Sequence, residues 1–210
     1  MSFYDDISGI MADMDKAARI SASSRNAIAD EKRNAAKQLD AGVWGEAGYS
    51  AKIRELDERE QAVALSFEQA VSDALDKFER VKGETFGVKP RQLDSEFCNM
   101  LNMVDLTEDE AFTLFRNCKM EGQHTKARAV CKAAQAAGID IVNDTPRYIE
   151  AAERAVNEFA EYCRSLSTGG SSADAYANAW DQITESILNR LKDSESDWMA
   201  GTYAHEETAA

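Results

Sequence analysis

The stretch Asp40–Ser50, DAGVWGEAGYS, decides how the first part of the chain folds. It places three glycines and two large aromatic residues between two long segments that are rich in alanine and charged residues and lack proline. Such segments favour helix, whereas clustered glycines favour a turn. The stretch therefore predicts the turn of a long antiparallel helical hairpin formed by residues 1–82.

The hairpin is also predicted by its first residues and by its apolar spacing. Ser2 and Asp5 have the spacing of a capping box, which favours a helix start. Apolar or small residues then recur at steps of three and four from Phe3 to Leu39, and again from Ile53 to Val81 after a predicted N-cap at Ser50. Because two helices cover only half of each other's apolar stripe, we expect the C-terminal half or a second copy of the chain to complete the core.

The composition of the whole chain predicts an all-α protein. Only two prolines occur in 210 residues, 44% of the residues are hydrophobic, and strand-like alternation is nearly absent. The segment Gly83–Pro90, GETFGVKP, predicts a hinge at 83–90, followed by a helical C-terminal domain at 91–193 in the form of a multi-helix bundle. Residues 194–210 are predicted to be an acidic flexible tail.

Capping signals place the helices of the second half. Thr107 with Glu110 predicts a helix start, Gly122 and Gly138 predict helix ends, and Pro146 predicts a further start. A last helix is predicted from Ser172 to about Lys192. Its apolar stripe is Tyr176, Trp180, Ile183, Ile187 and Leu191.

The charge of the chain restricts its partners. The formal net charge is −14, and acids outnumber bases most strongly in residues 145–210, which hold 12 acids and 5 bases. Direct binding to nucleic acid or anionic lipid is not expected, because such partners attract clustered Lys and Arg. The sequence contains neither a membrane-spanning run nor a basic secretory leader, so a cytoplasmic location with reduced cysteines is expected.

No residue pattern indicates catalysis, a cofactor or a metal. Cys118, His124 and Cys131 lack the paired short spacing of zinc ligands, and GETFGVKP does not match the phosphate-binding loop GxxxxGK[ST]. We therefore expect a protein that is not an enzyme and needs no cofactor.

Two surfaces are candidates for contact with a protein. Trp44 and Tyr49 lie at the hairpin tip, far from any expected core, where they either dock a partner or pack across the turn. A basic contact patch is the second candidate, with the alternative that its charges offset neighbouring acids. Its residues are Arg116, Lys119, Lys126, Arg128 and Lys132.

Trp44-Gly45 in a hairpin turn resembles the WXG100 family of secreted proteins, and Tyr203–Glu207 fits the YxxxE tail of that secretion route. That family has W-x-G where this chain has W-G, and the resemblance covers residues 1–82 and one pentapeptide. It implies a type VII-secreted partner protein.

The MSFYDDI start, the turn AGVWGEAGYSAKI and the later LTEDEAF segment resemble small scaffold-like or accessory proteins encoded among the structural genes of phages and prophages of Gram-positive hosts. This resemblance implies a helical protein–protein interaction protein in virion assembly, in the host cytoplasm or on the virion, acting on protein partners or as a homo-oligomer. The acidic composition leaves a third hypothesis open, an inhibitor that mimics nucleic acid.

Overall fold

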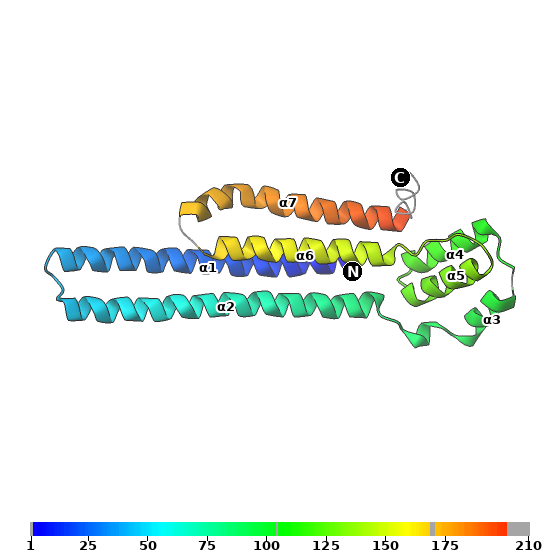
Figure 1. The fold of residues 1–210 in the computed structure, drawn as a ribbon, viewed down its shortest axis with the longest axis horizontal. Helices are drawn as coiled ribbons and strands as arrows, with labels where there is room; N and C mark the ends of the chain where they lie inside the picture. Colours follow the sequence, from blue (N-terminus) through cyan, green and yellow to red (C-terminus); the bar gives the residue numbers. More distant parts are fainter. Residues whose placement is uncertain (1, 104, 169–170, 201–210) are drawn as a thin grey trace. The chain divides into compact units, whose positions relative to one another are not determined.

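The computed structural model describes residues 2–103, 105–168 and 171–200, with the side chains of 171–179 excepted. These residues form seven α-helices and one short 3₁₀ helix, and none of them lies in a strand, which confirms the all-α class (Figure 1). The elements are α1 (Phe3–Asp40), α2 (Glu46–Phe86), η1 (Pro90–Gln92), α3 (Ser95–Met103), α4 (Glu108–Met120), α5 (His124–Ala136), α6 (Thr145–Ser167) and α7 (Ser171–Ala200).

The chain forms two compact units, each assembled from separate stretches of sequence. The first contains residues 1–6, 79–154 and 189–210, and the second contains 7–78 and 155–188. The domains predicted from the sequence are instead consecutive ranges, 1–82, 91–193 and a tail from 194, with a hinge at 83–90. Since α1, α2, α6 and α7 each contribute residues to both units, helix boundaries alone could not indicate this grouping.

Both predicted capping boxes form. The backbone N–H of Asp5 donates to Ser2 Oγ at 3.1 Å, and the N–H of Ser2 donates to the Asp5 carboxylate at 2.9 Å. At the start of α4, Glu110 N–H donates to Thr107 Oγ1 at 3.4 Å, while Thr107 N–H donates to the Glu110 carboxylate at 2.9 Å. Each pair satisfies two backbone donors that a helix start leaves open.

The hairpin turn is built on Gly42. Its φ of 69° is the left-handed conformation that glycine adopts at low cost, and it allows Val43 N–H to donate to the carbonyl of Gln38 at 2.9 Å, which closes α1. The N-cap predicted at Ser50 is wrong, because α2 already begins at Glu46 and Tyr49 N–H donates to the carbonyl of Gly45.

Three further boundaries also differ from prediction. Helix α2 runs through Gly83 to Phe86, since a helical glycine is tolerated and Phe86 gains burial. The last helix begins at Ser171 and continues to Ala200, so residues 194–200 are helical and not a flexible tail. Buried Trp198 accounts for this extension. Residues 201–210 and the side chain of Tyr176 lie outside the described residues.

The second unit combines a four-helix section with a two-helix extension. Ser21 Oγ of α1 donates to the carbonyl of Ser167 in α6 at 3.3 Å, and Trp180 of α7 packs on Phe159 of α6 with ring centroids 5.6 Å apart. Because α6 ends at Ser167, α1 and α2 continue alone beyond it (Figure 1). We call residues 25–60 the two-helix extension.

Two ion pairs, far apart along the hairpin, connect α1 with α2. Lys77 Nζ lies 3.0 Å from the Asp13 carboxylate, and Lys32 Nζ lies 2.7 Å from that of Asp57. Low residue numbers on α1 therefore meet high numbers on α2, as in the predicted antiparallel hairpin. The part of the core that lies in the extension is Ile28, Ala35 and Leu56.

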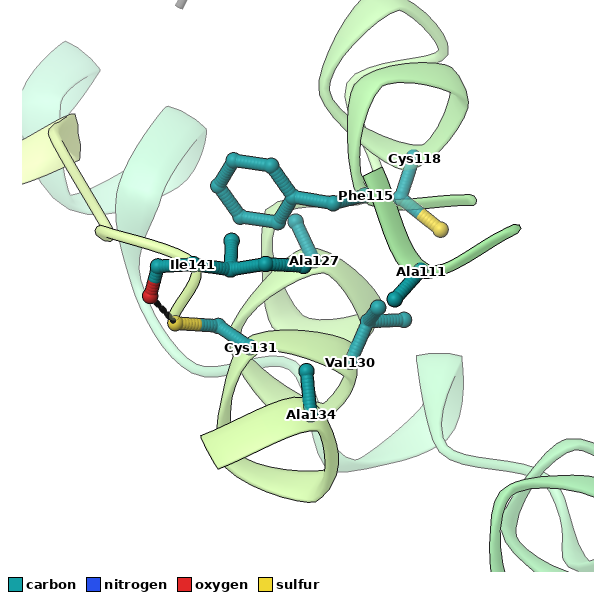
Figure 2. Packing of buried hydrophobic residues seen from close by; sticks show 8 residues of the cluster. All are labelled: Ala111, Phe115, Cys118, Ala127, Val130, Cys131, Ala134 and Ile141. Carbon is teal, nitrogen blue, oxygen red and sulfur yellow. Dashed lines mark hydrogen bonds between the residues drawn. The ribbon is translucent and has the colours of Figure 1, made fainter. Parts of the chain in front are cut away.

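The first unit has a small core between α4 and α5. Figure 2 shows Phe115 and Cys118 of α4 directed toward Ala127, Val130 and Cys131 of α5. Both helices end in a left-handed glycine, Gly122 with φ 68° and Gly138 with φ 81°, as predicted.

Among the described residues, no helix is both long and apolar enough to cross a bilayer.

Candidate functional site

The first unit contains an aromatic cluster that the sequence did not predict. It comprises five buried rings, Phe3, Phe86, His124, Tyr148 and Trp198, contributed by α1, α2, α5, α6 and α7. Tyr148 and Trp198 stack with their ring centroids 4.8 Å apart and their planes 9° from parallel. Phe86 meets Phe3 edge to face at 4.7 Å. The cluster is the largest gathering of aromatic rings in the described part of the chain.

A buried ion pair borders the aromatic cluster. Lys119 Nζ lies 2.9 Å from one carboxylate oxygen of Asp144 and 3.2 Å from the other, and both side chains are 3% exposed. The same ammonium donates to the backbone carbonyl of Trp198 and lies 4.8 Å from the centroid of the Trp198 ring. Lys119 therefore joins α4, the residue before α6 and the end of α7.

Burial shifts the pKa of both members of this pair. The loss of water lowers the pKa of Lys119 and raises the pKa of Asp144, because each charged form is less well solvated. Their mutual attraction opposes both shifts. Removing one member of a buried pair of this kind is strongly destabilising, whereas replacing both members by apolar residues of similar volume is often neutral.

His124 is a titratable member of the cluster, and its pKa is strongly shifted. Burial, with the nearby charges of Lys89, Arg128 and Lys119, lowers its pKa to about 4. Its Nδ1 is buried without a hydrogen-bond partner, and its ring packs 4.8 Å from Phe86. The side chain therefore acts as a neutral ring at pH 7.

The structure separates the members of the predicted basic contact patch. Lys119 is buried in the ion pair described above, Lys126 lies 3.4 Å from the Asp94 carboxylate, and Arg128 donates to the carbonyl of Phe86 at 2.9 Å. Arg116 and Lys132 are exposed. The spacing of Phe115, Cys118 and Lys119 on one side of α4 is the signal that could have placed Lys119 inside.

The hairpin tip holds the other predicted site residues. Trp44 and Tyr49 are half-buried. Val43, which lies between Gly42 and Trp44 in the sequence, is 69% exposed. The tip lies at the end of the two-helix extension, where neither α6 nor α7 covers it (Figure 1). Trp44 and Tyr49 therefore combine local packing with a surface that a partner can reach.

The cysteines and histidine weighed as metal ligands occupy packing positions. Cys118 packs in the core of α4 and α5, Cys131 Sγ donates to the carbonyl of Ile141 at 3.1 Å, and His124 belongs to the aromatic cluster. Within the described residues no group of three His, Cys, Asp or Glu side chains is arranged to hold a metal ion. All four cysteines are free thiols, and burial raises the pKa of Cys163 to about 12.

Comparisons with models of known protein families, with curated proteins and with solved structures found no match to this chain.

Proposed function

We propose that the protein is a non-enzymatic helical interaction protein that binds a protein partner through the tip of its two-helix extension. The observation that carries this proposal is that α1 and α2 continue past Ser167, the end of α6, and present Val43, Trp44 and Tyr49 at their turn. Aromatic side chains that are partly exposed on a rigid support are frequent anchors in protein interfaces.

The chemistry of the charged groups supports binding over catalysis. Lys119 and Asp144 are engaged with each other and with the Trp198 carbonyl, and His124 is packed between rings. All three side chains are buried, and each packs between helices. The cluster is therefore understood as a support for the fold.

The resemblance to proteins from phage structural regions suggests virion assembly as the setting, with the extension as the element that reaches a neighbouring protein. Nucleic-acid mimicry has less support, because it needs an unbroken face of carboxylates. In residues 25–60 the sequence has 8 acids and 7 bases, and Glu31, Asp57 and Glu60 are paired with cations. Type VII secretion rests on Trp44-Gly45 in the hairpin turn and on Tyr203–Glu207, and the second of these segments lies outside the described residues.

The test begins with the full chain carrying photoreactive p-benzoylphenylalanine in place of Val43, expressed in the cells that make the protein. A matched chain carries the same group in place of Leu65, which is 65% exposed on α2 outside the tip. A protein cross-linked from position 43 and not from position 65 is then purified. Its affinity is measured by titration calorimetry for the native chain and for the Trp44→Ala and Leu65→Ala variants.

The expected result is that Trp44→Ala weakens binding at least about tenfold, as for an interface anchor, while Leu65→Ala leaves it unchanged. Circular dichroism should show the same helicity for both variants, since neither side chain is in a core. Equal affinities for the native chain and Trp44→Ala would contradict the proposal.

A further inference from the structure

A groove of about 460 Å³ lies between α1 and α2 in the second unit. Its lining consists mainly of small side chains, with buried Phe67 and with Ile20, which is 58% exposed. The wall residues used below are Ala17, Ile20 and Ser24 of α1 with Val63, Ser66 and Ala70 of α2. Small side chains allow another helix to approach the two backbones closely.

The groove lies on a face of α1 and α2. An ion pair between the two helices marks each end of this face. The Lys77 ammonium lies 3.0 Å from the Asp13 carboxylate at one end, and the Arg59 guanidinium lies 2.9 Å from that of Glu31 at the other. On α1 the wall begins four residues after Asp13 and ends seven before Glu31. On α2 it begins three residues after Arg59, at Ala62, and ends seven before Lys77, so both stripes follow helical spacing.

This face is turned away from α6 and α7. Glu68, which lies 3.4 Å from Arg164 of α6, follows Ser66 by two residues, and residues two apart do not share a helix face. The same argument holds on α1, where Asp15 accepts a hydrogen bond from Trp180 of α7 and follows Asp13 by two residues. Helices α6 and α7 therefore do not cover the wall residues named above, whereas the buried lining residue Ser21 donates to the Ser167 carbonyl of α6.

We propose that this groove face binds the same face of a second copy of the chain, in a dimer whose two-fold axis runs parallel to α1 and α2. In that arrangement α1 of each copy lies over α2 of the other, at the same level along the hairpin. The inference goes beyond binding at the tip and does not depend on it, because the tip and the groove use different residues.

Charge and shape both favour this axis. Each acid at the ends of the face then meets a base of the second copy, Asp13 over Lys77 and Glu31 over Arg59, whereas an axis across the helices would place acid over acid. The register set by the two ion pairs puts Ile20 opposite Ala70 of the second copy. A bulky side chain then fills the space left by a small one, as in knobs-into-holes packing.

The size of the face predicts a weak dimer. Each stripe spans about 27 Å at about 1.5 Å per residue, and two packed helices are roughly 20 Å wide. The face therefore covers roughly 540 Å² per copy, or about 1,100 Å² in total, near the lower limit of specific interfaces. We expect a dimer that dissociates on dilution in the micromolar range.

The experiment is sedimentation equilibrium of the full chain from about 1 µM to about 500 µM, a range that brackets micromolar affinity. The native chain should pass from monomer to dimer. Ile20→Glu should raise the dissociation constant at least about tenfold, because it places a charge in the groove of the second copy. Ala70→Leu, which fills the opposing space, should weaken the dimer as well.

Leu65→Glu is the matched control, since Leu65 is 65% exposed and does not line the groove. It introduces the same charge and should leave the dissociation constant unchanged. A native chain that remains monomeric over the whole range would overturn the inference. A dimer that Ile20→Glu and Ala70→Leu do not weaken, or that Leu65→Glu weakens equally, would also overturn it. None of these outcomes bears on the Trp44→Ala result, so the two proposals can fail separately.

Discussion

The two-helix extension and the aromatic cluster use charged side chains in opposite ways. In the extension, Arg59 pairs with Glu31 at the surface, where the two side chains are 46% and 39% exposed. Beside the cluster, Lys119 and Asp144 are each 3% exposed, and the Lys119 ammonium lies over the Trp198 ring. The first arrangement leaves both charges hydrated, whereas the second removes both from water.

The two regions therefore differ in the interactions that stabilise them. Surface ion pairs contribute about 0–1 kcal/mol each, so the extension depends mainly on Ile28, Ala35 and Leu56 between its helices. Loss of one member of a buried pair costs about 3–5 kcal/mol, because the remaining charge has no partner. The cluster should therefore be strongly coupled to folding, and the extension should tolerate change.

The largest effect is expected for Asp144→Ala. This substitution leaves the Lys119 ammonium buried without its carboxylate, and we expect it to lower the free energy of unfolding by about 3–5 kcal/mol at pH 7. Chemical denaturation followed by Trp fluorescence and circular dichroism measures the change.

The double variant Lys119→Met, Asp144→Leu separates the charge from the packing. It removes both charges with side chains of similar size, so it should recover most of the stability lost in Asp144→Ala. A loss in the double variant as large as in the single variant would show that the contacts of Lys119 with the Trp198 carbonyl, and not the unpaired charge, determine the cost.

The second effect concerns pH. The His124 pKa is about 4 in the folded chain and about 6.5 when the residue is exposed, so the unfolded state binds a proton first as the pH falls. Protonation then favours unfolding between about pH 6.5 and pH 4, and the native chain should lose about 2–3 kcal/mol over this window from this residue.

His124→Gln tests whether His124 causes this pH dependence, because glutamine does not titrate. The difference in unfolding free energy between the native chain and the variant should change by about 2–3 kcal/mol from pH 7 to pH 4, with the variant relatively more stable at low pH. Asp144 and the carboxylates of the surface titrate in both chains and cancel in this comparison. A difference that does not vary with pH would contradict the shifted pKa of His124.

Local signals in the sequence predicted the helices well. Capping boxes at Ser2 and Thr107 and glycines at 122 and 138 act over one turn of helix, so they can be recognised without knowledge of the fold. The hairpin followed from two matched apolar stripes. The start of α2 was missed because Gly45 and Glu46 replace the expected serine cap.

The aromatic cluster could not be predicted in the same way. Phe3, Phe86 and Trp198 come from distant parts of the chain, and each lies near a helix end, where apolar spacing carries little information. Lys119 was assigned to a surface patch because a lysine is rarely buried. Its partner Asp144 lies 25 residues away, next to the helix start predicted at Pro146, and no local sequence pattern links the two residues.

The smallest effect is expected in the extension. Arg59→Ala removes the pair with Glu31, which is exposed to solvent, and should lower the free energy of unfolding by less than about 1 kcal/mol. The loss should shrink further in about 1 M NaCl, because salt screens surface charges. Parallel denaturation of the native chain and the variant at low and high salt measures both values. A loss near that of Asp144→Ala would mean that the extension depends on its ion pairs and not on its three buried apolar residues. The contrast between the two regions would then be wrong.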